Sequence, residues 1–180
     1  MRNDNYRRYT QAEAVPTRKV LQHPTKLDLF FPVHGRPQRL PNVDYASADC
    51  LCFITFNVNA AAEALLTGEN GPIAWVALNE QLTQIGCTVH ACCMMPDHVH
   101  ILLAPSGAGE TVSDIVRRVK SYICLALRRE KQAYLKWQPS FFDHVLRDRE
   151  RTEDEIQTIV AYIRLNPAKA GLGDTYPFIV

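Results

Sequence analysis

The chain has 180 residues, of which 47% are hydrophobic and 22% are charged, with a formal net charge of +1. This length suits one domain of ordinary size with an extension, and the composition is typical of a soluble globular protein. No run of about eighteen apolar residues occurs, which excludes a transmembrane helix, and the N-terminus lacks the apolar stretch of a secretory signal. We therefore expect a cytoplasmic protein without membrane contact.

The basic residues are segregated along the chain. Residues 1–41 carry eight Lys and Arg against three acidic residues, whereas residues 42–116 contain eight acidic residues and no Lys or Arg. Residues 117–151 then hold ten basic against four acidic residues. Basic blocks on either side of a non-basic middle favour a polyanionic partner, although a solvated surface with uneven charge is the alternative.

Six cysteines lie in or beside apolar stretches, at positions 50, 52, 87, 92, 93 and 124. In a cytosolic protein they should be reduced, and a free cysteine is buried like a small hydrophobic residue. Their spacing lacks the CxxC pairs of zinc sites, so we expect no structural zinc.

Strand and helix patterns alternate after an irregular, proline-containing stretch over residues 1–48. Strands are recognised by β-branched and aromatic runs, and helices by a 3.6-residue apolar stripe with capping residues. The predicted elements are strand 50–58, helix 71–85, strands 87–94 and 98–104, helix 111–131, strand 141–146 and helix 152–166. The last helix should begin with a capping box at Thr152 and Glu155, and end at Asn166 before Pro167. This order predicts an α+β fold, a ferredoxin-like antiparallel sheet with helices packed on one face.

Two histidines, His98 and His100, stand two residues apart in the strand predicted over 98–104. Side chains at i and i+2 leave the same face of a strand, so both imidazoles can converge on one metal ion. Val99 and Ile101 should then point into a core. Two core histidines with ordinary hydrogen-bond partners are the alternative.

Tyr162 and Asn166 lie four residues apart on the last predicted helix, where they are surface neighbours. Two imidazoles and an amide oxygen would form a three-ligand site with open positions for substrate oxygens. A divalent ion there can polarise a phosphoryl oxygen, and a tyrosine beside it is a candidate nucleophile. A tyrosine at the edge of a helical stripe is otherwise simply packed.

Three segments resemble a known family. They are Met95 to Leu103 (MPDHVHILL), Phe142 to Val145 (FDHV) and Tyr162 to Leu172 (YIRLNPAKAGL). In order and spacing they are similar to the REP-associated tyrosine transposases, single-tyrosine members of the HUH (His-hydrophobe-His) nucleases of bacteria. The resemblance extends from about Arg36 to Leu172.

The resemblance implies that His98, His100 and Asn166 hold Mg²⁺ or Mn²⁺ and that Tyr162 is the nucleophile. The implied reaction cleaves single-stranded DNA beside a hairpin and leaves a 5′-phosphotyrosine and a free 3′-hydroxyl. Rejoining to another 3′-hydroxyl would complete strand transfer without ATP, in the cytoplasm and at the nucleoid. Two neutral imidazoles and an amide form a weak Mg²⁺ site, so substrate phosphate is expected to complete it.

The expected domain organisation is a basic arm over 1–48, a catalytic domain over 49–174 and a tail over 175–180. Residues expected to contact DNA phosphates lie on the arm, on the helix over 111–131 and after Tyr162: Arg36, Arg39, Arg117, Lys120, Arg128 and Lys169. The sequence does not distinguish a monomer from a homodimer.

Two other functions fit the same residues. A domesticated relative would bind structured DNA without cutting it, although the motif is intact in this chain. A hydrolytic metal site would use water as the nucleophile, but no Asp or Glu stands at an obvious ligand spacing beside the histidines.

Overall fold

A computed structural model describes residues 40–59, 66–173 and 175–180. Most of the predicted basic arm, including Arg36 and Arg39, lies outside these residues. None of the helices in the described ranges is long and apolar enough to cross a membrane.

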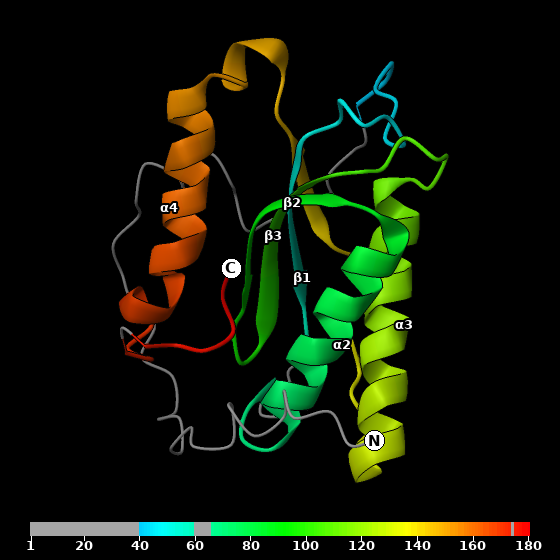
Figure 1. The fold of residues 1–180 in the computed structure, drawn as a ribbon, viewed down its shortest axis with the longest axis vertical. Coiled ribbons are helices and arrows are strands. Elements are labelled where there is room, and N and C mark those ends of the chain that lie inside the picture. The colour runs from blue at the N-terminus through cyan, green and yellow to red at the C-terminus, as the bar shows by residue number, and fades with distance from the viewer. Residues whose placement is uncertain (1–39, 60–65, 174) are drawn as a thin grey trace.

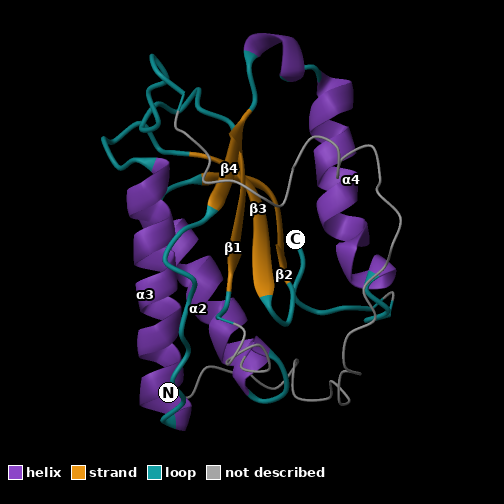
Figure 2. Cartoon of the chain, turned by 180° about the vertical axis from the view of Figure 1, so that it is seen from behind, coloured by secondary structure: helices purple, strands orange, loops and turns teal. Residues whose placement is uncertain are grey.

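Four antiparallel strands form one sheet, in the order β2-β3-β1-β4 (Figure 2). The strands are β1 (Cys52–Asn57), β2 (Thr88–Met94), β3 (His98–Ala104) and β4 (Phe142–Val145). The helices are α2 (Asn70–Ile85), α3 (Val112–Lys131) and α4 (Glu153–Lys169), with a short 3-10 helix η3 (Asp148–Glu150). The predicted elements are therefore all present, and the α+β class with an antiparallel sheet is confirmed.

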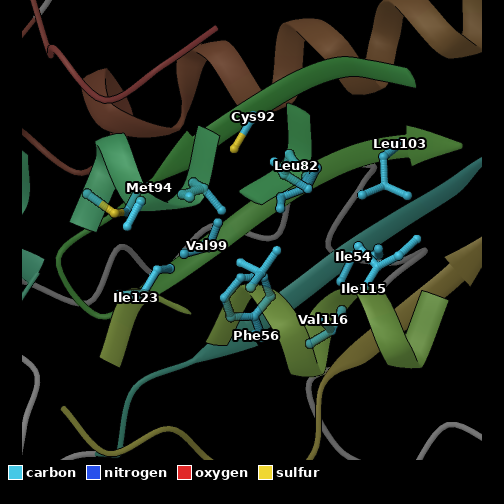
Figure 3. Close-up of a cluster of buried hydrophobic side chains, with 14 of the residues drawn as sticks. Ile54, Phe56, Leu82, Cys92, Met94, Val99, Leu103, Ile115, Val116 and Ile123 are labelled. Carbon is cyan, nitrogen blue, oxygen red and sulfur yellow. The ribbon is translucent and has the colours of Figure 1, made fainter. Parts of the chain in front are cut away.

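Helices α2 and α3 cover one face of the sheet and enclose the larger core (Figures 1 and 3). Alternate residues of each strand point into this core, including Ile54 and Phe56 from β1 and Val99 and Ile101 from β3. Burial of such side chains is the main driving force for assembling the layers.

The expectation that the helices pack on one face is correct for α2 and α3 only. Helix α4 covers the opposite face, where Ile159, Val160 and Ile163 pack on the strand residues that alternate with those of the first core (Figure 1). The reason is that the central strands are apolar on both faces, since residues 91–94 and 99–104 are all buried. A sheet with two apolar faces needs a layer on each.

Helix α4 differs from the prediction at both ends. Thr152 accepts a hydrogen bond from the Glu155 amide, which is one half of the expected capping box. The predicted end at Asn166 is wrong, because the helix continues through Pro167 to Lys169. Pro167 is buried in the last turn, and because it lacks an N–H, the helix continues at the cost of one hydrogen bond, to the carbonyl of Ile163.

Residues 175–180 pair with β2 at the edge of the sheet. Cys92 and Val180 exchange two backbone hydrogen bonds of 3.0 and 2.9 Å, and the Met94 amide donates to the Phe178 carbonyl. The Phe178 ring is buried, and a Cβ added at Gly71 would lie 2.7 Å from it. The segment is therefore part of the domain's packing, and Gly71 provides the space for it.

All six cysteines are free, as expected, with four of them buried and Cys87 and Cys124 half-buried.

Candidate active site

The two histidines lie side by side on β3, on the face that α4 covers. Their Nε2 atoms are 3.0 Å apart and their ring centroids 4.5 Å apart. Val99, between them, points into the core on the other face. The predicted same-face arrangement is confirmed.

The second nitrogen of each imidazole has its own partner. His98 Nδ1 is 2.6 Å from an Asp97 carboxylate oxygen, and His100 Nδ1 is 2.8 Å from the Thr55 hydroxyl oxygen. Thr55 stands directly opposite His100 in the pairing of β1 with β3. Such partners orient a histidine ring and select its tautomer.

The two partners differ in what they permit. A carboxylate can only accept, so His98 donates from Nδ1, and its Nε2 atom faces His100. A hydroxyl can donate or accept, so Thr55 is compatible with either tautomer of His100. Burial, followed by the neighbouring His98, holds the pKa of His100 well below its usual range, so this ring is neutral at physiological pH. The two Nε2 atoms are thus close enough to address one ligand.

Tyr162 of α4 completes an aromatic cluster above the sheet. Its ring centroid lies 5.8 Å from that of His100 and 6.2 Å from that of Phe53, which in turn stacks on His100 at 5.5 Å. Phe53 and Thr55 alternate with core residues along β1 and so share the face of the histidines. The structure therefore brings the predicted nucleophile and the predicted ligand pair together.

Asn166 and Lys169 follow Tyr162 along α4. The Asn166 side-chain nitrogen is buried and has no hydrogen-bond partner among the described residues. Lys169 places its ammonium 5.1 Å from the centre of the Tyr162 ring, within the range of a cation–π contact. The site thus contains an amide that lacks a partner and a cation beside the phenol.

The donor set fits a divalent metal ion. Two cis ligands at about 2.1 Å from an octahedral ion are separated by about 3.0 Å, which is the Nε2 separation found here. Both Nδ1 atoms are held by second partners, and the buried Asn166 amide can turn its oxygen toward a ligand by a flip of the side chain. Across the described ranges no group of three His, Cys, Asp or Glu residues is placed to hold a metal ion.

The basic residues predicted on α3 lie away from the histidines. Helix α3 covers the opposite face of the sheet from α4 (Figure 2). Arg117 pairs with Asp114 at 2.8 Å, and Arg128 lies over the ring of Tyr134. Lys120 donates to the carbonyls of residues 138 and 140, and partial burial lowers its pKa to about 8. Of the described residues predicted to contact DNA, only Lys169 lies beside Tyr162.

Sequence reasoning assigned no role to three residues that contact the histidines: Phe53, Thr55 and Asp97. Asp97 is adjacent to His98 in sequence, and a search for carboxylates next to candidate ligands would have found it. Phe53 and Thr55 required the pairing of β1 with β3, which brings together residues 45 positions apart. Strand alternation alone places them on one face but does not select the facing strand.

A family model described as "Transposase IS200 like" matches residues 58–166, which include both histidines, Tyr162 and Asn166. The chain belongs to this family. Membership of this family gives the chain a role in DNA processing during transposition. No protein with a curated description matches the chain in sequence.

Two solved structures are similar to the IS200-like transposase. One is a REP-associated tyrosine transposase bound to a REP hairpin, with a TM-score of 0.61 and 21% identity over 79% of this chain and 82% of that chain. The other is a candidate transposase from Deinococcus radiodurans R1, with a TM-score of 0.47 and 19% identity over 71% and 98% of the two chains. The first similarity supports the fold predicted from the sequence resemblance.

Proposed function

We propose that this IS200-like transposase cuts and joins single-stranded DNA with Tyr162 as its nucleophile. The observation that carries the proposal is the packing of the Tyr162 ring against His100, in a pair whose Nε2 atoms face each other at 3.0 Å. A structural tyrosine has no need of such neighbours, whereas phosphoryl transfer needs a nucleophile next to groups that orient a phosphate.

In the proposed reaction the Tyr162 hydroxyl oxygen attacks a DNA phosphorus atom and releases its proton to solvent. The bond from phosphorus to the 3′ oxygen breaks, which leaves a 5′-phosphotyrosine and a free 3′-hydroxyl. Attack by another 3′-hydroxyl on the phosphotyrosine reverses these bond changes and joins the strands without ATP. A divalent ion, Mg²⁺ or Mn²⁺, would be held by His98, His100 and Asn166 and would supply Lewis-acid polarisation of a phosphoryl oxygen.

Lys169 has a specific role in this proposal. Negative charge moves from the phenol oxygen to the phosphoryl oxygens during the attack, and a fixed cation beside this path stabilises it. The ammonium of Lys169, 5.1 Å from the Tyr162 ring centre, is positioned for this purpose. Arg117, Lys120 and Arg128 of α3, and Arg36 and Arg39 of the arm, remain predicted phosphate contacts.

The proposed substrate is DNA that contains a hairpin within repeated sequence. Support comes from the family and from the fold, because the similar REP-associated transposase was solved with a REP hairpin bound. Cutting next to a hairpin requires an unpaired strand at the nucleophile.

A denaturing gel tests the nucleophile. The full chain is incubated with Mn²⁺ and labelled single-stranded hairpins from its own genomic flanks. We expect a covalent band that survives denaturation and is lost with EDTA and in Tyr162→Phe. Tyr134→Phe is the matched control, because Tyr134 is 74% exposed and its ring lies against Arg128, outside the aromatic cluster of Tyr162 and His100. Cleavage that persists in Tyr162→Phe would refute the assignment, and hairpin binding without an adduct would indicate a non-cutting binder.

A further inference from the structure

We propose that a cavity at the β4 edge of the sheet binds one unpaired nucleotide of the DNA strand, an inference that rests on the proposed function. The cavity has a volume of about 200 Å³ and lies between β4, η3 and the segment around residues 40–45. This is smaller than the roughly 300–1,000 Å³ of sites for drug-sized ligands, and it suits a single nucleotide. Asp143, His144 and Val145 of its lining belong to the FDHV segment, to which the sequence analysis assigned no binding role.

Two arginines line this cavity, Arg147 and Arg149. Both are exposed, and neither forms an ion pair with a carboxylate in the part of the chain that the structure describes. By contrast, Arg117, Arg118 and Arg151 are each paired with a carboxylate. Arg147 and Arg149 are two sequence positions apart, and their guanidinium groups, which form no ion pair with a carboxylate among the described residues, provide donors that recognise a phosphate.

The rest of the lining suits a base more than a free anion. Tyr45 and His144 contribute aromatic rings, and Asp143 and Glu150 contribute carboxylates. Glu150 Oε2 already accepts from the Arg147 amide at 2.9 Å and lies 3.7 Å from His144 Nε2, so a base N–H group would share these carboxylates with their present neighbours. Burial lowers the pKa of His144, so its ring is largely neutral at physiological pH and can stack. Carboxylates would repel an isolated phosphate, whereas a nucleotide pairs its phosphate with the arginines and its base with the other groups.

The cavity lies two strands away from the histidine pair, at β4, with β1 between β4 and β3. His144 of β4 stands opposite Phe53 of β1, and Phe53 stacks on His100. Two strand spacings and two residues along the strand separate His100 from His144, which amounts to roughly 12 Å. A strand whose phosphate lies at Tyr162 can therefore continue across the sheet to this edge. A duplex is too wide to enter a cavity of this size.

Binding measurements on the full chain test this proposal. All proteins carry Tyr162→Phe and are kept in EDTA, and the probe is a fluorescein-labelled oligothymidine followed by fluorescence anisotropy. We expect Arg147→Ala with Arg149→Ala to weaken binding about tenfold and to reduce the salt slope by roughly 0.7, for the lost contact with one phosphate of a single strand. The matched pair is Arg129→Ala with Lys131→Ala, two exposed residues at the end of α3 that are not predicted to contact DNA, so that equal charge is removed.

A second measurement locates the base. Photocrosslinking of a 4-thiothymidine oligonucleotide should label the segments that contain Tyr45 and His144. Equal loss of affinity in both double variants would overturn the proposal, because general charge would then explain binding. Loss of affinity without a crosslink in these segments would overturn the base contact. Since no cleavage is measured, absence of a covalent adduct in the wild type counts against the proposed function alone.

Discussion

Replacing Thr55 by Val should weaken metal binding although Thr55 is not a proposed ligand. Valine keeps the shape of threonine but removes the hydroxyl that lies 2.8 Å from His100 Nδ1. When His100 binds a metal through Nε2, its Nδ1 carries a proton that needs an acceptor. Without Thr55 this N–H is left in a site where the His100 side chain is only 7% exposed, so water replaces the hydroxyl poorly.

The expected loss is about 10–100-fold in Mn²⁺ affinity, the usual effect of removing such a partner, or about 1.4–2.7 kcal/mol. The near-complete burial of His100 places the change in the upper part of this range. Electron paramagnetic resonance of free Mn²⁺, titrated against the full chain without DNA, measures it directly. ¹⁵N chemical shifts of His100 should report a change of tautomer on metal binding.

Thr55→Ser is the control, because it restores the hydroxyl and should bind Mn²⁺ nearly as the wild type does. Thermal unfolding of both variants separates a local effect from loss of the fold. Equal affinity in Thr55→Val and wild type, with both folded, would refute the argument from the tautomer. Equally weak binding by Thr55→Ser would also refute it, because the hydroxyl would then not be the cause.

Three further predictions concern other parts of the molecule. Lys169→Met should slow adduct formation about 10–100-fold with little change in oligonucleotide affinity, and Lys169→Arg should restore most of the rate; a loss confined to affinity would make Lys169 a simple phosphate contact. Gly71→Ala should lower the free energy of unfolding by about 1–3 kcal/mol, because its Cβ would lie 2.7 Å from the Phe178 ring; denaturant titration measures this, and Phe178→Leu in the same chain should recover part of it. Asn166→Asp should tighten Mn²⁺ binding, since carboxylates suit this ion better than amides, and unchanged affinity would show that residue 166 is not a ligand.

The local pattern of the chain predicts most of the fold. Strand alternation and helical stripes located every major element, because period and capping residues are local properties. Pro167 is the exception: the local rule ends the helix before it, while burial of the ring in the interior lets the helix continue. The placement of α4 on the second face was not predicted for a similar reason. The position of this helix depends on how fully both faces of the strands are buried, which is not a local property of the sequence.

Spacing in the sequence is enough to predict that two histidines share one face of a strand and that Tyr162 and Asn166 share one side of a helix. Spacing decides such relations because they lie within a single element. The folded structure was needed to show that these elements meet and that Thr55 and Phe53 contact His100. It was also needed to show that α3 lies on the other side of the sheet. Contacts between distant segments depend on which apolar faces can be buried together, and that is a property of the whole chain.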